Sequence, residues 1–524
     1  MSDIADLLVI GGGINGAGIA RDAALRGLDV VLVERDDIGA GTTSDSTKLI
    51  HGGLRYLEHF EFPLVHESLR ERERLLALAP HLVRPLRFLI PIYRGGPYPR
   101  PMIRAGLVLY DLMAGFHTRL PRSQAVSARA LCEAVPALAS EDLLGGFAYR
   151  DAQAPYPERL CLENILDAHA AGARILTRCE VVGFLRKKNR ILGVVARGRD
   201  DGGESTLRAR LVINAAGPWV DAVLGLVDRR IAGRMGGTRG MHMLLPRRPG
   251  GPDVALYTPA RADGRPFFVI PWREYYWVGT TEVPQPDPDA AVPTAAERGY
   301  LLRELGRLLP GLHYTPDDIF YVQSGVRPLR RHDFRKPGAV TRRHTILDHR
   351  ESDGLDGLIS IIGGKLTTYR SLAEEAVDKV FEHWGKRPPP CPTRDRPLPG
   401  SGSCVVPRGA DVQLVAHLVG LYGSRAEGVL ALAGCASGLA ERLDPCLPNI
   451  AAEVVWAVRH EFARHLDDVL LRRTGIGTGH TEGLGCLDKV AGLMAGDFGW
   501  SPDTCAREIE RYHAIIDRDH RVHG

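Results

Sequence analysis

The sequence lacks the cysteine pairs and the long apolar runs that would place it in several large protein classes. Its 9 cysteines are scattered and include no CxxC pair, which argues against a disulfide framework or a metal site and favours a reducing compartment. No apolar run reaches about 18 residues, so no helix is predicted to cross a bilayer. The first residues, MSDIAD, are acidic and lead into a predicted strand, so no signal peptide is expected.

The sequence also lacks an excess of charge of either sign. It has 67 Lys and Arg against 63 Asp and Glu, which gives a net charge of +4. This balance argues against a general nucleic-acid-binding protein but is compatible with local basic patches. A chain of 524 residues with 44% hydrophobic residues is expected to fold into two or three soluble globular domains.

What the sequence does contain is a strand–turn–helix–strand pattern over residues 5–36. Residues 6–10 are a short apolar run, residues 17–26 have helical spacing, and residues 29–34 form a second apolar run. Parallel strands buried on both faces have this continuous apolar character. The segment therefore predicts a βαβ unit.

The turn in this unit has the spacing of a dinucleotide-binding site. Gly11, Gly13 and Gly16 form GxGxxG, in which the first glycine allows a tight turn, the second lets a pyrophosphate approach the helix N-terminus, and the third lets the helix pack on the strand. Glu34 ends the second strand, where a carboxylate accepts hydrogen bonds from a ribose diol and disfavours a 2′-phosphate. The pattern predicts binding of FAD or NAD rather than NADP.

Three further segments favour FAD, although each alone is also compatible with an ordinary loop or strand end. Residues 39–48 (GAGTTSDSTK) offer hydroxyls and amides to a pyrophosphate, and residues 211–219 (LVINAAGPW) end a strand in small residues that suit a flat ligand. Residues 360–370 (SIIGGKLTTYR) place Lys365 at a second helix start, where positive charge would stabilise a reduced flavin. A second glycine-rich helix start this late in the chain is unexpected for an NAD dehydrogenase. It is expected if the chain contacts the same long dinucleotide a second time.

These motifs resemble the FAD-dependent, quinone-linked (aerobic) glycerol-3-phosphate dehydrogenases. The resemblance is carried by the N-terminal unit together with HGGLRYLE, NAAGPWV, SGVRPL and GGKLTTYRSLAE; it reaches about residue 384 and continues through residues 451–477. It implies an α/β plus α fold with three parts. These are a glutathione-reductase/D-amino-acid-oxidase-type (Rossmann-like) FAD domain, an antiparallel-sheet substrate domain and a helical C-terminal domain.

The resemblance and a Pro/Gly-rich stretch also suggest domain limits. A discontinuous FAD-binding domain is expected over residues 1–80, 150–220 and 325–385. The substrate domain is expected over residues 81–149 and 221–324, where residues 231–330 alternate like an antiparallel sheet. A linker at 386–403 then leads to the helical domain at 404–524.

The implied reaction oxidises sn-glycerol 3-phosphate to dihydroxyacetone phosphate, with hydride passed to FAD and electrons on to ubiquinone or menaquinone. Glu282 follows GTT where the family usually has Asp, and RRHDFRK follows SGVRPL where the family tends to be acidic. The nearest alternatives are therefore another polyol phosphate, such as erythritol phosphate, or oxygen as the acceptor. A non-catalytic FAD-binding membrane protein is the alternative from another class.

Family positions point to a set of substrate-binding residues. Arg55, Arg327 and Arg342 are expected to clamp the phosphate, because guanidinium is planar, always charged and matched to phosphate oxygens. Tyr56 and Thr280 are expected to contact the substrate, although Tyr56 also suits a place in the core.

The catalytic residues are expected to be Arg327, a histidine base and a lysine. His242 and His51 are both candidates for the base, since an imidazole titrates near working pH, and Lys365 would stabilise the reduced flavin. The residues expected to contact FAD are Gly11, Gly13, Asn15, Gly16, Glu34, Thr42, Thr43, Ser44, Lys48, His51, Gly52, Gly53, Val181, Ala216, Gly217, Gly364, Lys365, Leu366 and Thr367.

The route by which electrons leave the protein is the last prediction. No NAD site, haem motif or iron–sulfur pattern is visible, which implies a quinone acceptor at a membrane. Residues 98–122 form an apolar segment flanked by Arg100, Arg104, Arg119 and Arg122. This suits a helix lying on an anionic inner-membrane surface, and a buried helix is the alternative. The protein is thus expected in the cytoplasm, peripherally bound to the cytoplasmic membrane. The sequence is compatible with a homodimer.

Overall fold

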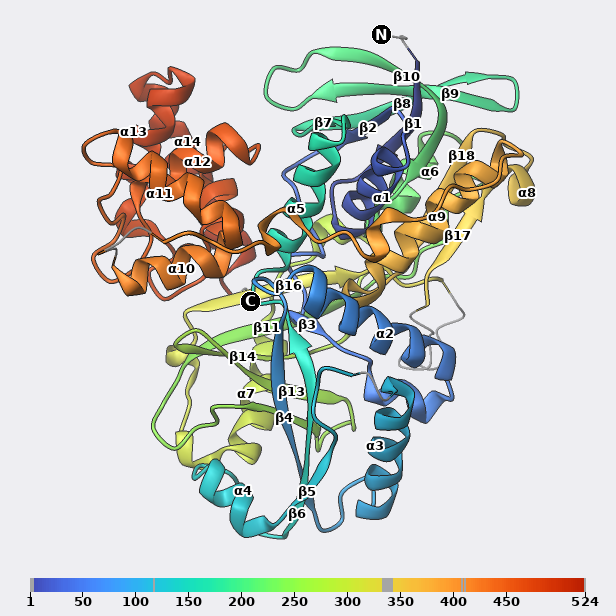
Figure 1. The fold of residues 1–524 in the computed structure, drawn as a ribbon. Coiled ribbons are helices and arrows are strands. Elements are labelled where there is room, and N and C mark those ends of the chain that lie inside the picture. Colours follow the sequence, from blue (N-terminus) through green and yellow to red (C-terminus); the bar gives the residue numbers. More distant parts are fainter. Residues whose placement is uncertain (1–3, 116–117, 332–342, 407–408, 410, 523–524) are drawn as a thin grey trace.

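The computed structural model describes residues 4–115, 118–331, 343–406, 409 and 411–522, which form two sheet-based parts and a helical part beside them (Figure 1). The first part is built on a sheet with the order β17-β18-β10-β1-β2-β7, extended by β9 and β8 beyond β10. Its strands are β1 (Ile4–Ile10), β2 (Val30–Val33), β7 (Arg174–Leu176), β8 (Cys179–Lys187), β9 (Arg190–Gly198), β10 (Glu204–Asn214), β17 (Thr345–Asp348) and β18 (Leu358–Ile362).

The centre of this first sheet is parallel, as the continuous apolar runs predicted. β1 pairs in parallel with both β10 and β2, and β10 pairs in parallel with β18. Helices α1 (Ile14–Leu25), α5 (Pro157–Ala170) and α9 (Tyr369–His383) pack together against it in one hydrophobic core. α1 begins three residues earlier than its apolar spacing suggested, directly after Gly13.

The second part is built on a sheet with the order β15-β11-β14-β13-β12-β4-β6-β3, with β16 beside β11 and β5 beside β6. Its named pairings are antiparallel apart from that of β12 with β4. Its strands are β3 (Leu49–Ile50), β4 (Arg84–Tyr93), β5 (Gln124–Val126), β6 (Leu143–Gln153), β11 (Thr238–Pro246), β12 (Ala255–Pro259), β13 (Pro266–Trp272), β14 (Tyr275–Gly279), β15 (Val283–Pro284) and β16 (Tyr321–Arg327).

Helices cover both faces of this second sheet. One core joins it to α4 (Ala128–Ala134) and α7 (Ala295–Leu308), and another joins it to α2 (Phe62–Leu78) and α3 (Arg100–Ala114). The sheet crosses the expected domain limits, because β3, the end of β6 and the end of β16 lie in ranges assigned to the FAD domain. The two parts are therefore joined through these strands as well as through their interface.

The C-terminal part is helical, and a linker attaches it to the first part. It contains α10 (Val412–Tyr422), α11 (Ala426–Cys435), α12 (Ala451–His460), α13 (Leu487–Phe498) and α14 (Pro502–Asp519). One core joins α12, α13 and α14, and a smaller one joins α10 and α11 to the start of α12. The linker follows the first part, where the Leu398 amide donates to the Leu78 carbonyl (2.9 Å) and the Gly400 amide to Glu163 (3.1 Å). Two short helices elsewhere are α6 (Val220–Gly225) and α8 (His349–Asp353).

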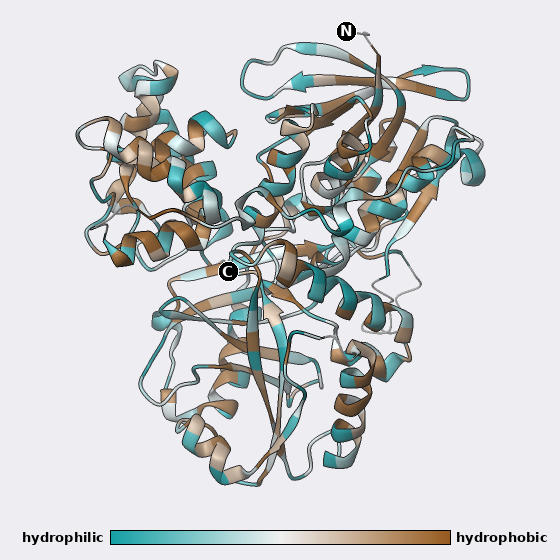
Figure 2. Cartoon of the chain, viewed as in Figure 1, coloured by the Kyte–Doolittle hydropathy of each residue, from teal (hydrophilic) through white to brown (hydrophobic). Residues whose placement is uncertain are grey.

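The expected surface helix at 98–122 is shorter than predicted. α3 ends at Ala114 because Gly115 follows with a φ of 81°, a backbone conformation that favours glycine, so Arg119 and Arg122 do not extend it. Figure 2 colours much of α3 as hydrophobic, yet its exposed residues include Met102, Val108, Leu109 and Leu112. In the part of the chain that the structure describes, no helix has the length and apolarity needed to cross a bilayer.

Candidate active site

The GxGxxG turn packs so closely that side chains are excluded from it. Gly11 has a φ of 105°, and a Cβ there would lie 2.7 Å from the Ala215 carbonyl oxygen. A Cβ on Gly16 would lie 1.9 Å from the Gly11 carbonyl oxygen. The end of β1, the start of α1 and the end of β10 can therefore meet only with glycine here, which leaves the first amides of α1 at a site suited to an anion.

Polar groups gather at this helix start. Glu34 accepts hydrogen bonds from the amides of Gly12 (2.5 Å) and Asp36 (2.7 Å), and burial raises the pKa of its carboxyl. Thr43 Oγ1 accepts from the Ile14 amide at 3.0 Å. Asn15 Nδ2 lies 3.3 Å from the Gly363 carbonyl, while its buried Oδ1 has no hydrogen-bond partner among the described residues. This set fits a bound dinucleotide, with a carboxylate for a ribose and donors for a pyrophosphate.

The two glycine-pair motifs predicted to meet the flavin contact one another through neighbouring residues. Thr367 Oγ1 accepts from the His51 amide (3.0 Å) and donates to the His51 carbonyl (3.2 Å). Lys365 Nζ donates to Ser68 Oγ (3.1 Å), lies 4.1 Å from the ring centre of Tyr56, and would lie 3.3 Å from a Cβ on Gly53. The structure thus brings the HGG and GGK motifs together, and their individual contacts with FAD stay predictions.

Other residues predicted to contact FAD surround this centre. Thr42 Oγ1 donates to the Val326 carbonyl (2.7 Å) and Ser44 Oγ to the Gly39 carbonyl (2.7 Å). Lys48 is buried, with Nζ 3.8 Å from Glu158 and 4.9 Å from the Trp277 ring centre. Val181 lies in β8, and Ala216 and Gly217 lie two and three residues after the end of β10.

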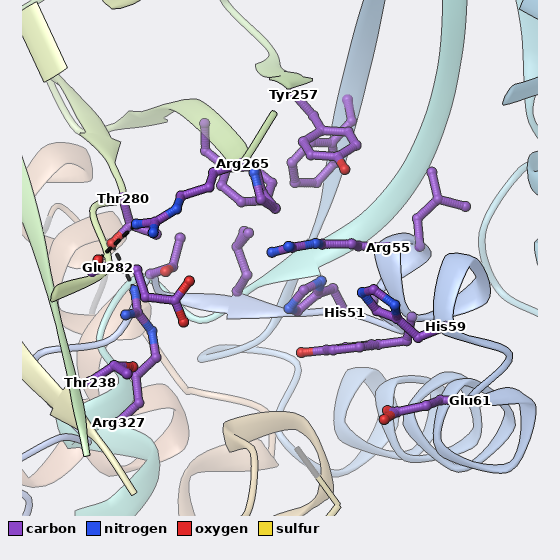
Figure 3. A pocket seen from close by; sticks show the side chains of 18 of the residues that line it. His51, Arg55, His59, Glu61, Thr238, Tyr257, Arg265, Thr280, Glu282 and Arg327 are labelled. Carbon is purple, nitrogen blue, oxygen red and sulfur yellow. Dashed lines mark hydrogen bonds between the residues drawn. The ribbon is translucent and has the colours of Figure 1, made fainter. Parts of the chain in front are cut away.

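A cavity of about 120 Å³ opens between the second sheet and the helical turn Leu54–His59 (Figure 3). Arg55, Tyr56, Thr280 and Arg327 line it, whereas Arg342 lies outside the described residues. The lining residues that the sequence did not single out as site residues include His59, Glu61, Thr238, Tyr257, Arg265 and Glu282. The cavity is therefore rich in arginine but also contains two carboxylates.

Strand register and two glycines place Arg327 and His242. β11 pairs with β16 so that Thr238 faces Arg327, and with β14 so that His242 faces Gly279. A Cβ on Gly240 would lie 2.0 Å from the Arg327 guanidinium, and one on Gly279 would lie 2.2 Å from the His242 ring. The missing side chains let Arg327 reach Thr280 Oγ1 at 2.9 Å.

The structure separates the two candidate bases. His242 is buried behind the cavity wall, with Nε2 3.0 Å from Thr47 Oγ1 and its ring stacked on Trp277. Burial, followed by the positive charges of Arg327 and Lys48, lowers the pKa of His242 to about 3, so the ring is neutral at working pH. His51 lines the cavity directly, as Figure 3 shows. Both stay candidates for the proton acceptor, because a bound anionic substrate would raise the pKa of a nearby imidazole.

Arg265 is the functional candidate that sequence reasoning missed. Its Nη1 donates to the Glu282 carbonyl at 2.8 Å, and its side chain lies on the cavity wall near Thr280 (Figure 3). In the sequence it stands in ADGRPFF, where an arginine after a turn is usually solvated. Only the pairing of β13 with β14 brings this turn beside residues 279–282.

Comparisons with known proteins agree with this architecture. Residues 6–370 match the family described as FAD dependent oxidoreductase, and residues 360–505 match the C-terminal domain of alpha-glycerophosphate oxidase. A glycerol-3-phosphate dehydrogenase of Synechocystis is 42% identical over 537 residues, which cover 98% of this chain and 96% of the relative. The aerobic glycerol-3-phosphate dehydrogenase of Escherichia coli is 39% identical, over 90% of this chain and 93% of its own.

A solved structure extends the similarity to the whole fold. The glycerol-3-phosphate dehydrogenase from Bacillus halodurans, solved in complex with FAD, superposes with a TM-score of 0.79 at 29% identity and covers 98% of this chain and 95% of its own. The predicted FAD-type fold, the helical C-terminal domain and the FAD cofactor are thereby confirmed. The chain belongs to the FAD-dependent glycerol-3-phosphate dehydrogenase family.

Proposed function

We propose that the protein oxidises sn-glycerol 3-phosphate to dihydroxyacetone phosphate and passes the electrons to a membrane quinone. The observation that carries this proposal is the cavity that Arg55, Arg265 and Arg327 line together with His51, whose backbone is bonded to the GGK motif. A phosphorylated alcohol held there would lie beside the residues predicted to contact the flavin. FAD, when bound, supplies the acceptor for the carbinol hydride.

The protein's own residues bind and orient the substrate in this proposal. Arg55, Arg265 and Arg327, with Arg342 as a further predicted member, hold the phosphate, because several guanidinium groups match its oxygens. Glu282, whose carboxylate points into the cavity in Figure 3, accepts hydrogen bonds from polyol hydroxyls. A neutral imidazole, of His51 or His242, takes the hydroxyl proton. Correct orientation of the carbinol supplies much of the rate.

α3 supports the membrane part of the proposal. Its exposed face combines Met102, Leu109 and Leu112 with Arg100 and Arg104, a pattern suited to the headgroup region of an anionic bilayer. Sedimentation with anionic vesicles tests this. Replacement of both arginines by Glu should reduce the bound fraction, and equal binding of the variant would remove α3 from the proposal.

Anaerobic reduction of the flavin tests the reaction. Glycerol 3-phosphate should bleach the flavin absorbance of the purified holoprotein faster than erythritol phosphate does, and a quinone analogue should restore it faster than oxygen does. Absence of bleaching by glycerol 3-phosphate would overturn the proposed substrate. Faster bleaching by erythritol phosphate would assign the cavity to a longer polyol phosphate, and faster recovery with oxygen would indicate an oxidase.

A further inference from the structure

The glycine pair of the HGG motif has two different surroundings. A Cβ on Gly53 would meet the Tyr56 ring at 2.2 Å and would lie near Lys365. A Cβ on Gly52 would instead meet Tyr110 Oη at 2.5 Å and Leu69 at 2.6 Å. The space beside Gly52 is therefore filled by side chains of α3 and α2, and its amide donates to Tyr110 Oη at 2.9 Å.

A buried carboxylate holds this tyrosine. Tyr110 Oη lies 2.9 and 2.8 Å from the two carboxylate oxygens of Asp151 on β6, and the Gly52 amide lies 3.4 Å from Oδ1. Arg72 Nη1 donates to the same Oδ1 at 2.6 Å. Tyr110, Asp151 and Arg72 are each at most 2% exposed. Side chains from three elements, α2, α3 and β6, thus converge beside one backbone amide of the HGG loop.

We propose that Tyr110 and Asp151 are positioning residues for the substrate site, which fix the Gly52 amide and through it His51 and Arg55. Neither side chain lines the cavity, so neither is a catalytic residue. The loop is held from the opposite side by Thr367, which bonds both the amide and the carbonyl of His51. Removal of one of the two attachments leaves His51 and Arg55 on a loop with more freedom, and small displacements of binding groups cost rate steeply.

The geometry also explains why α3 bears on the site. Leu107 and Tyr110 are its buried residues among the fifteen of the helix. The segment after α3 is fastened nearby, because Thr118 Oγ1 and the Arg119 amide both donate to Glu73, which bonds Arg72. The surface helix α3 is therefore joined to the HGG loop through the Tyr110 hydroxyl and the Asp151 carboxylate.

Tyr110→Phe tests the inference, because it removes the hydroxyl and keeps the ring. In the FAD-loaded protein, kcat/KM for glycerol 3-phosphate should fall about tenfold, in line with the loss of one buried hydrogen bond to a charged network. Deuterium uptake of a peptide spanning residues 48–58 should increase. Tyr93→Phe is the matched control, since Tyr93 lies on β4 of the same sheet, away from the loop, and its Oη donates to the Ala139 carbonyl. It should change neither quantity.

A double variant separates positioning from folding. Asp151→Asn acts on the same amide, so its effect on kcat/KM combined with Tyr110→Phe should be less than the product of the two single effects. Unchanged kcat/KM and unchanged deuterium uptake in Tyr110→Phe would overturn the inference. A lower melting temperature with normal turnover per bound flavin would assign the network a structural role only. The kinetic readout rests on the proposed function, whereas deuterium uptake does not, so failure of either can be recognised.

Discussion

Two arginines of this protein, Arg327 and Arg473, show how one residue type serves opposite purposes. Arg327 lies at the wall of a cavity, where its contacts include the Thr280 hydroxyl at 2.9 Å and the Thr281 carbonyl at 3.2 Å. Arg473 lies between the C-terminal and FAD-binding parts, and its guanidinium forms a two-pronged ion pair with Asp37 at 2.7 and 2.8 Å.

The two arginines differ in what surrounds the guanidinium group. Arg473 is 1% exposed, and Arg472 is bonded to the same Asp37 at 2.5 Å. The two arginines and the carboxylate therefore form a closed cluster. Burial would raise the pKa of Asp37, but the charges of Arg473 and Arg472 outweigh it and lower that pKa to about 2. An arginine with a carboxylate on its fork joins domains, and an arginine beside open space can receive a phosphate.

The largest effect is expected at the closed cluster. Arg473→Met leaves Asp37 with a reduced set of partners in the interior and should destabilise the fold by about 3–5 kcal/mol, visible as a lower melting temperature of the holoprotein. Arg129→Met is the control, because Arg129 forms an exposed pair with Glu133 and should shift melting by less than about 1 °C. Equal shifts in melting temperature would contradict the stabilising role given to the buried Arg473, because the exposed Arg129 would then contribute as much.

At the cavity, the effect should appear in turnover rather than in stability. Arg327→Met should lower kcat/KM about 100-fold, the usual loss when one preorganised charged donor is removed, while flavin content and melting temperature stay near those of the parent. Steady-state kinetics per bound flavin measures this. Arg330→Met, three residues along and exposed, should keep the parental rate. Loss of FAD from the Arg327 variant would contradict its place in the substrate clamp.

A smaller, pH-dependent effect is expected at Asp45, which is eight residues from Asp37 but lacks an arginine fork. Burial raises the pKa of Asp45 to about 7, although Gln323 Nε2 donates to it at 2.6 Å. Because the folded pKa exceeds the ordinary one, ionisation of Asp45 weakens the fold as pH rises from about 4 to 7. Asp45→Asn should therefore raise the melting temperature at pH 8, with a gain that shrinks toward pH 5. A gain independent of pH would contradict a buried, ionising Asp45.

The parts of the fold and of the candidate site that depend on local backbone geometry could be predicted from the sequence. GxGxxG and Glu34 predicted the turn, the helix that follows it and the carboxylate beside it, because these follow from spacing within one βαβ unit. The length of α3 was overestimated, because the predicted helix included Arg119 and Arg122 as its basic end, whereas the backbone leaves the helix at Gly115. Arg265 was missed because its importance depends on a strand pairing that its neighbours in sequence do not encode.

The sequence by itself determined the βαβ unit and its dinucleotide turn, because short-range spacing and apolar patterning dictate these. The FAD-type fold followed from the resemblance of its motifs to a known family. Only the tertiary structure decided which arginines face a cavity and which are neutralised by carboxylates. It also decided that Gly52 accommodates Tyr110, and that His242 is a neutral, buried ring. These properties depend on burial and on the distance between charges, and both arise from contacts between segments far apart in the chain.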